Sequence, residues 1–202
     1  MVIENIIFDL GNVLLTFKPE IFLKQFTNDP SEIDFFISNI TRSSTWLSLD
    51  RGISSVDDAK KIFISRFPEK KELISWFFEN WFSIFAPIED NVNLLVKLKK
   101  ADLKLYILSN FIEEAYNYVK EKFDFFSLFD GAIISSKEKV IKPEKEIYMI
   151  LINRYNLIPE KSVFIDDILP FLRPAKKLGM KTIWYKSDIN LNESLKKLGV
   201  SF

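Results

Sequence analysis

The sequence of 202 residues contains no cysteine and no histidine. Without cysteine, the protein can form no disulfide, hold no thiolate zinc site and use no thiol nucleophile, and a reducing compartment is permitted. Without histidine, Ser-His-Asp catalysis, imidazole metal ligands and the usual proton shuttle near neutral pH are excluded. Any catalysis must therefore use carboxylates, lysine, arginine, tyrosine, hydroxyls or a metal ion bound by oxygen.

Neither sign of charge is in excess, because 28 lysine and arginine residues balance 28 aspartate and glutamate residues. A zero net charge gives no indication of nucleic acid as a partner. The first apolar run is interrupted by Glu4 and Asn5, and no apolar stretch approaches membrane-spanning length. We therefore expect a soluble cytoplasmic protein, a monomer or homodimer, with no membrane or nucleic acid partner.

Five short apolar runs predict buried strands at residues 5–9, 103–108, 131–135, 162–166 and 181–185. Their nearly continuous hydrophobicity is typical of parallel strands covered on both faces. Amphipathic helices are predicted between the later strands, at residues 91–100, 112–122, 144–155 and 170–178. This alternation predicts an α/β fold with a doubly wound parallel sheet.

The segment from residue 16 to residue 87 interrupts this alternation, since it contains no convincing strand and several helical patterns. Ser31 with Asp34, and Ser54 with Asp57, have the spacing of helix N-terminal caps. We therefore expect an α/β core of residues 1–15 and 88–202, with a helical cap domain of residues 16–87 inserted into it.

Much of the aromatic content lies in the predicted insertion, including Trp46, Trp76 and Trp81. We expect most of these side chains to form the core of a helical bundle. A minority could line a substrate pocket or a dimer contact, because aromatic residues between a cap and a core face whatever binds there.

Polar residues follow several of the predicted strands. Asp9 ends the first, Ser109-Asn110 the second and Asp166-Asp167 the fourth, while Lys142-Pro143 opens the helix after the third. Each of these alone has a structural explanation, as a turn, a cap or the end of a strand. Together they converge on the carboxyl edge of a parallel sheet, where ligands bind in open α/β folds.

This arrangement resembles the haloacid dehalogenase (HAD) superfamily of phosphatases and related hydrolases. The segment Phe8-Asp9-Leu10-Gly11-Asn12-Val13 is similar to its first motif, and the three later pairs are similar to its second, third and fourth motifs. The resemblance covers essentially the whole chain and implies a Rossmann-like core with a helical cap. Within the cap, Asp50-Arg51-Gly52-Ile53-Ser54 resembles a loop that enters the active site.

The resemblance implies Mg²⁺ as cofactor and a reaction through an aspartyl-phosphate intermediate. Hard oxygen donors suit Mg²⁺, and a carboxylate can act as nucleophile on phosphorus. The implied metal ligands are Asp9, the Gly11 carbonyl, Asp166 and Asp167, with Asp167 binding directly and Asp166 through water, or the reverse. The implied catalytic residues are Asp9 and Lys142, and the implied substrate-binding residues are Ser109, Asn110, Lys142 and Arg51.

Three departures from the family pattern are visible. Gly11 stands where many family phosphatases have a second Asp that acts as general acid and base, Lys139 stands where the family often has Gly, and an apolar run at 168–171 replaces small polar residues. The sequence thus predicts a Mg²⁺-dependent phosphatase of a small phosphate monoester, a sugar phosphate being one candidate. The alternatives are a catalytically silent protein that binds a phosphorylated ligand or a partner and, with less support, a dehalogenase or a phosphomutase.

Overall fold

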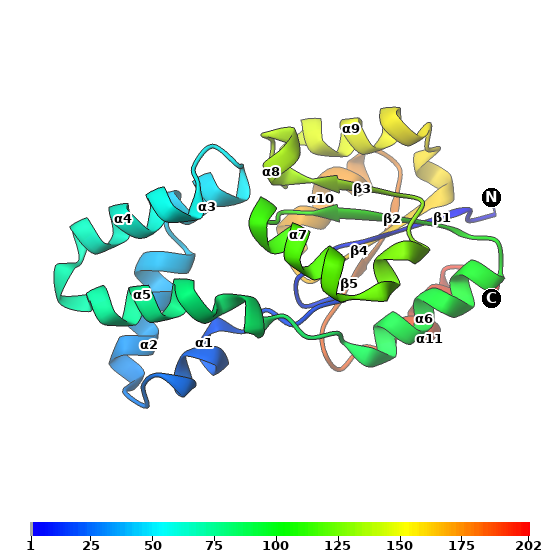
Figure 1. The fold of residues 1–202 in the computed structure, drawn as a ribbon. Helices are drawn as coiled ribbons and strands as arrows, with labels where there is room; N and C mark the ends of the chain where they lie inside the picture. The colour runs from blue at the N-terminus through cyan, green and yellow to red at the C-terminus, as the bar shows by residue number, and fades with distance from the viewer. Residues whose placement is uncertain (1) are drawn as a thin grey trace.

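Strand β1, Asn5–Phe8, lies at the centre of a five-stranded parallel sheet with the order β3-β2-β1-β4-β5 (Figure 1). The structure is a computed structural model and describes residues 2–202. The other strands are β2 Lys104–Ser109, β3 Gly131–Ile134, β4 Ser162–Asp166 and β5 Lys181–Trp184. The predicted fold class and the predicted strands are confirmed, because continuous apolar runs suit strands buried on both faces.

Alternate side chains of β1 enter two separate hydrophobic clusters. Ile6 and Phe8 belong to one and Ile7 to the other, as the two-residue repeat of a strand requires. Apolar residues of α6 Glu89–Lys100, α7 Glu113–Lys122 and α11 Leu191–Lys197 join the first cluster. Residues of α9 Lys145–Tyr155 and α10 Leu169–Lys177 join the second. The sheet is therefore covered by helices on both sides.

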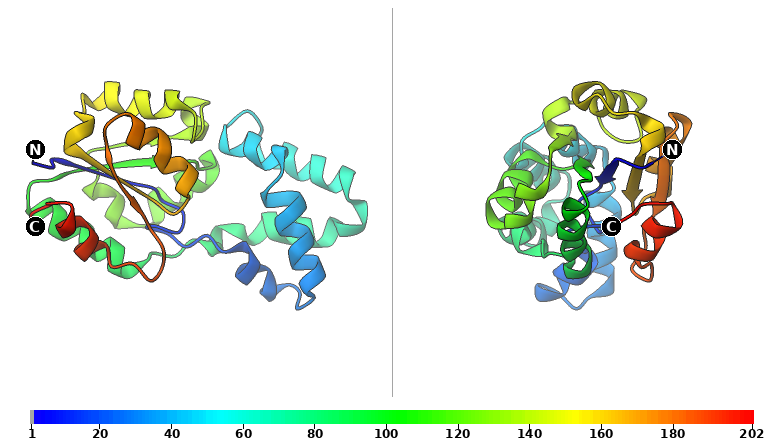
Figure 2. Two further views of the ribbon diagram at one scale, coloured as in Figure 1. Left: turned by 180° about the vertical axis from the view of Figure 1, so that it is seen from behind. Right: turned by 90° about the vertical axis from the view of Figure 1, so that its right-hand side faces the viewer.

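Between β1 and α6 the chain forms helices without strands: α1 Pro19–Phe22, α2 Pro30–Phe36, a π-helical turn Ile37–Thr41, α3 Ser44–Asp50, α4 Val56–Arg66 and α5 Lys71–Asn80. Phe36, Phe63 and Phe77 are fully buried among them. These helices lie beyond the carboxyl ends of the strands, and both chain termini lie at the opposite end of the sheet (Figure 2). The division into domains at residues 15/16 and 87/88 stays a prediction.

Two neighbouring segments connect these helices to the sheet. The Thr16 amide donates to the Ala86 carbonyl at 2.8 Å, and the Ile88 amide donates to the Leu14 carbonyl at 2.8 Å. The Thr16 hydroxyl also donates to the Ile84 carbonyl at 2.7 Å. The outgoing and returning chain are thus joined by hydrogen bonds where they pass between the helices and the sheet.

Local details differ from the sequence prediction at the helix ends. Helix α2 is capped by Asp29, whose carboxylate accepts from the Ser31 amide, and α4 by Ser55, which accepts from the Asp58 amide. The short helix α8, Ser135–Glu138, was not predicted. Within residues 2–202, every helix is too short or too polar to cross a lipid bilayer.

Candidate active site

Three carboxylates meet where β1 and β4 end. The two strands pair in parallel with Phe8 opposite Ile165, so Asp9 and Asp166 leave the sheet side by side. Asp9, Asp166 and Asp167 each have a carboxylate oxygen within 4.8 Å of the others. The structure therefore brings together the three aspartates that the sequence predicts as metal ligands, although which of them would bind a metal stays a prediction.

The side chain of Lys142 is buried between two of these carboxylates. Its Nζ lies 2.8 Å from Asp9 Oδ1 and 2.6 Å from Asp166 Oδ2, and only 1% of the side chain is exposed. Burial alone would lower the pKa of Lys142, but the negative charges of Asp166 and Asp9 outweigh it and raise the pKa. Lys142 is therefore a permanent positive charge beside Asp9.

Asn110 fixes the backbone of Lys142 from the neighbouring strand end. Its Oδ1 accepts from the Lys142 amide at 2.7 Å, and its Nδ2 donates to the Lys142 carbonyl at 3.1 Å. The amide also lines the cavity described below. Asn110, predicted as a substrate contact, thus positions Lys142 in this structure.

The two aspartates that end β4 have different surroundings. Asp166 is fully buried, and both of its oxygens are engaged, one by Lys142 and one by the Ile168 amide at 2.7 Å. Asp167 lines the cavity and accepts a hydrogen bond from Asn12 Nδ2 at 3.3 Å. Burial raises the pKa of Asp167 to about 6, and the charge of Asp9 adds to the effect. A bound cation would oppose this shift, because it favours the ionised carboxylate.

The donor set suits a hard divalent cation. The cluster has three carboxylates and one ammonium, which pairs with only two of them, so it keeps an excess of negative charge. All the candidate ligand atoms are oxygens. Gly11 lies close by, since a Cβ built on it would lie 4.0 Å from Asp9 Oδ2. Mg²⁺ therefore fits the residues present.

The hydroxyl of Ser109, predicted to bind substrate, is buried at the end of β2 and has no hydrogen-bond partner among the described residues. A buried hydroxyl without a partner is costly, and such groups usually meet a ligand or an ordered water. Ser109 follows the last residue of β2 that pairs with β1, and it is not among the residues that line the cavity described below. Its role as a substrate contact stays a prediction.

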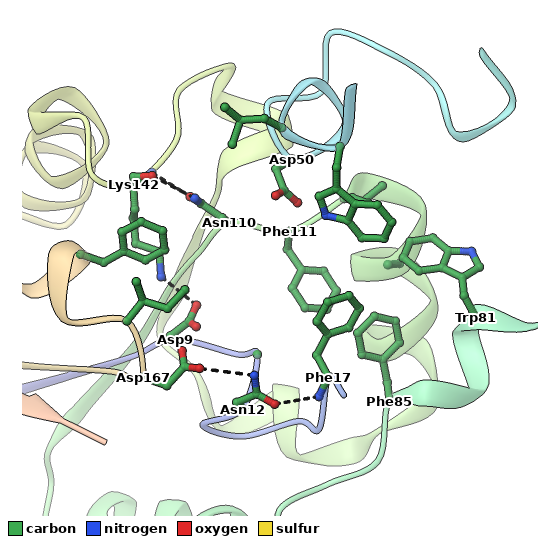
Figure 3. A pocket seen from close by; sticks show the side chains of 17 residues that line it. Asp9, Asn12, Phe17, Asp50, Trp81, Phe85, Asn110, Phe111, Lys142 and Asp167 are labelled. Carbon is green, nitrogen blue, oxygen red and sulfur yellow. Dashed lines mark hydrogen bonds and ion pairs between the residues drawn. The ribbon is translucent and has the colours of Figure 1, made fainter. Parts of the chain in front are cut away.

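A cavity of about 220 Å³ opens above the aspartates. Its polar wall contains Asp9, Gly11, Asn12, Asp50, Asn110, Lys142 and Asp167. The rest of the lining is apolar and largely aromatic: Phe17, Trp46, Leu47, Trp81, Phe85, Phe111, Ile112, Ala115, Ile168 and Phe171. Figure 3 shows the rings of Phe17, Trp81, Phe85 and Phe111 gathered on the side away from Lys142. The apolar run at 168–171 therefore contributes to this wall.

The loop at the end of α3 is held against the core by four contacts. Arg51 pairs with Glu144 and donates to the Lys139 carbonyl at 3.3 Å. The Ser135 hydroxyl donates to the Asp50 carbonyl, and Lys139 Nζ donates to the Gly52 carbonyl. Arg51 does not line the cavity, whereas the preceding residue does. The predicted substrate contact at Arg51 is thus placed in an ion pair between the loop and the core.

Sequence reasoning missed Asp50, Asn12 and the identity of the aromatic wall. Asp50 belongs to the same loop as Arg51. Only Arg51 was predicted to contact the substrate, because a positive charge attracts a phosphate. Asn12 adopts a left-handed backbone with φ of 52° and also accepts from the Phe17 amide at 3.0 Å, joining Asp167 to the cavity wall. The Gly-Asn pair indicated a turn, but it could not predict that the Asn12 side chain binds Asp167 and the Phe17 amide.

Comparisons of the sequence with known proteins agree on one family of hydrolases. A family model described as haloacid dehalogenase-like hydrolase matches residues 3–179. A sesquiterpene phosphatase of Aspergillus oryzae is 26% identical over 174 residues, which span 86% of this chain and 85% of that protein. A glyceraldehyde 3-phosphate phosphatase of Pyrococcus furiosus is 32% identical over 95 residues, 46% of this chain and 39% of that protein.

Solved structures share the fold. A HAD family enzyme of Bacteroides thetaiotaomicron, determined as a magnesium complex, superposes with a TM-score of 0.78 at 21% identity, covering 97% of this chain and all of that one. A predicted HAD-like hydrolase of Porphyromonas gingivalis superposes with a TM-score of 0.74 at 19% identity over the full length of both chains. At these identities the superpositions show the common architecture.

Proposed function

Because this chain belongs to the haloacid dehalogenase-like hydrolase family, we propose that it is a Mg²⁺-dependent phosphatase that hydrolyses a small phosphate monoester through an aspartyl-phosphate on Asp9. The observation that carries the proposal is the position of the Asp9 carboxylate. It lies at the cavity, 2.8 Å from a buried ammonium and within 4.8 Å of two further carboxylates.

In the first half-reaction, an Asp9 oxygen attacks phosphorus, and the bond between phosphorus and the leaving oxygen breaks. Lys142 holds Oδ1 of Asp9, so Oδ2 is free to attack. The Lys142 charge and the unpartnered Ser109 hydroxyl stabilise the phosphoryl oxygens as negative charge develops on them. In the second half-reaction, water attacks the same phosphorus, inorganic phosphate leaves and the Asp9 carboxylate is regenerated.

Mg²⁺ would neutralise charge on the transferred phosphoryl group and orient it toward Asp9. Asp9 and Asp167 face the cavity and would hold the ion, together with the Gly11 carbonyl. Both carboxylate oxygens of Asp166 already accept hydrogen bonds, one from Lys142 and one from the Ile168 amide. Asp166 would therefore orient the lysine rather than bind the ion directly.

The apolar wall supports a substrate whose organic group is apolar. A sugar presents several hydroxyls, and each hydroxyl without a partner would cost about 1–3 kcal/mol. Among the ten apolar residues of the wall, only the indoles of Trp46 and Trp81 carry a side-chain hydrogen-bond donor. The similarity to a sesquiterpene phosphatase points in the same direction. An alkyl, prenyl or aryl phosphate therefore fits this cavity better than a sugar phosphate.

The test is steady-state hydrolysis of p-nitrophenyl phosphate by the wild type with Mg²⁺, by the wild type with EDTA and by Asp9→Asn. We expect turnover that requires Mg²⁺ and that Asp9→Asn abolishes, because an amide cannot form the acyl phosphate. Asp34→Asn, an exposed carboxylate in α2, is the matched control and should be fully active. If the wild type does not exceed Asp9→Asn, the protein is a ligand- or partner-binding member of its family.

A further inference from the structure

The leaving oxygen of an unactivated phosphate ester needs a proton, and the position beside the nucleophile does not provide one. Residue 11 is a glycine, so no side chain stands there. Asp166 is paired with Lys142, and Asp167 faces the predicted cation. A general acid contributes about 10² to 10⁴ in rate for poor leaving groups, so a phosphatase gains from finding one elsewhere in the site.

Asp50 is the remaining carboxyl group in the cavity lining. It ends helix α3 and reaches the cavity from the helical insertion, on the side opposite the strand ends that carry Asp9 (Figure 3). No hydrogen bond or ion pair engages its carboxylate anywhere in residues 2–202, although its carbonyl accepts from Ser135. Trp46 and Leu47 of the same helix line the cavity beside it.

The environment of Asp50 suits a group that must carry a proton. The pKa of Asp50 is raised to about 7, chiefly by burial and also by the negative charge of Asp9, while the positive charge of Lys142 opposes both. An unpartnered carboxyl group among apolar side chains contributes nothing to stability in its ionised form. A functional role explains why it is there.

We infer that Asp50 is the general acid and base of this active site, supplied by the helical insertion in place of the missing carboxylate at position 11. The inference rests on the proposed function. Displacement at phosphorus is roughly in line, so attack by Asp9 places the leaving oxygen on the far side of phosphorus, which is the side from which Asp50 enters.

The proton balance closes over the two half-reactions. The Asp50 carboxylic acid gives its proton to the leaving oxygen as the bond to phosphorus breaks, and the alcohol departs neutral. The Asp50 carboxylate then accepts a proton from the water that attacks the aspartyl-phosphate. The acid form is restored, and one ester plus one water give one alcohol plus inorganic phosphate.

The position of Asp50 is fixed by the core and not by the insertion alone. The buried Ser135 hydroxyl holds its carbonyl, while the next two residues are held by Glu144 and Lys139. Ser135 also accepts from the Phe111 amide at 3.0 Å, which ties it to the end of β2. These contacts give a residue from a distant segment the precision that proton transfer requires.

The test compares Asp50→Asn with the wild type on two aryl phosphates of similar shape, p-nitrophenyl phosphate and phenyl phosphate, with saturating Mg²⁺. The nitrophenolate leaves without a proton, whereas phenolate, whose pKa is about 10 like that of tyrosine, needs one. We expect Asp50→Asn to lower kcat/KM for phenyl phosphate by about 10² to 10⁴ and for p-nitrophenyl phosphate by less than about tenfold. Asp57→Asn, an exposed carboxylate in α4, should change neither.

A second measurement separates catalysis from folding. Asp50→Asn should unfold in urea at the same or a higher concentration than the wild type, because it removes an unpartnered carboxyl group. Equal losses on the two substrates, or full activity on phenyl phosphate, would overturn the inference while leaving the phosphatase proposal intact. A wild type inactive on both substrates contradicts the proposed function itself, and the assignment of Asp50 falls with it.

Discussion

At the scale of single residues, Lys142 has the largest energetic consequence. Its ammonium is buried between Asp9 and Asp166, and it lies over the rings of Phe164 and Phe171 at 5.4 and 5.1 Å from their centroids. Burial of an ion pair gives little net stability, but removing one partner leaves an uncompensated charge in a medium of low dielectric constant. Lys142 is thus required by its neighbours for folding as well as for the chemistry proposed here.

We therefore expect Lys142→Met to lower the free energy of unfolding by about 3–5 kcal/mol, measured by urea denaturation without metal. Added Mg²⁺ should restore part of the loss, since a cation that binds the folded state stabilises it and compensates the carboxylates. Lys100→Met, at an exposed position of α6, should change stability by less than about 0.5 kcal/mol. A loss below about 1 kcal/mol for Lys142→Met would contradict this account.

Residue types predicted which groups gather in the site, but not which way each side chain points. Asp9 and the aspartate pair could be predicted because strand ends determine their place, whereas Lys142 lies between α8 and α9 and is predicted by the family resemblance. Asp50 and Arg51 are adjacent, and the last turn of α3 sends the first into the cavity and the second to Glu144. The pairs Ser54–Asp57 and Ser55–Asp58 have identical spacing, so sequence spacing alone could not select Ser55 as the cap.

At the scale of elements, the loop of residues 50–52 decides whether the site is complete. Gly52 has a φ of 70°, and a Cβ there would lie 2.2 Å from the Ser136 carbonyl oxygen. Lys139 has a left-handed backbone with φ of 61°, a conformation that favours glycine, and its ammonium in return holds the Gly52 carbonyl. The loop and the core segment therefore fit each other closely only because residue 52 has no side chain.

Gly52→Ala should push the loop away from the core and displace Asp50. We expect kcat/KM for phenyl phosphate to fall by roughly 10²-fold, since a displacement of about 1 Å can cost that much. Gly199→Ala is the matched control, because Gly199 has a φ of 82° but open space around it. Both variants should lose about 1–2 kcal/mol of stability from the left-handed backbone, and only Gly52→Ala should lose activity. Similar activity in the two variants would show that the close fit is unimportant.

Strands and long helices were predictable at this scale because a buried strand needs a continuous apolar run and a surface helix needs a periodic one. The short helix α8, Ser135–Glu138, has four residues and too little sequence to show a period. Pro30 starts α2 and makes Asp29 its cap, which displaces the predicted start at Ser31.

At the scale of the whole molecule, the cavity lies between the inserted helices and the strand ends, and its walls come from both. Trp46, Leu47 and Trp81 belong to the inserted segment, whereas Phe111 and Phe171 follow β2 and β4. Its volume is about 220 Å³, and ten of its seventeen lining residues are apolar. This composition is the basis for the apolar phosphate ester proposed above.

Benzyl phosphate and a short prenyl phosphate should be hydrolysed with a kcat/KM at least about tenfold above that of glucose 6-phosphate, because each unpaired sugar hydroxyl costs about 1–3 kcal/mol. Leu47→Asn should reduce this preference, since Leu47 lines the cavity yet is 47% exposed and tolerates a polar side chain. Ile53→Asn, 66% exposed and outside the cavity lining, should leave it unchanged. A preference for the sugar phosphate would contradict the proposal that the apolar cavity wall binds an apolar organic group.

At this scale the family resemblance predicted a Rossmann-like core with a helical cap. It could not predict the character of the cavity, because the aromatic residues of the insertion divide between two environments. Trp76 stacks on Phe22 with ring centroids 5.0 Å apart inside the bundle, whereas Trp46 and Trp81 line the cavity. Residue type alone could not separate these roles, because all three are tryptophans of the same inserted segment.

The hydrogen bond between the Leu14 carbonyl and the Ile88 amide shows that the inserted segment leaves and re-enters the core at one place. The 73 residues between these two positions begin and end at adjacent points in space, so recombination at two sites could exchange them without disturbing the sheet. Such an exchange would replace Leu47, Trp81 and Asp50 together while keeping Asp9 and Lys142. Substrate range and the proton donor would then be inherited as one unit, separately from the nucleophile.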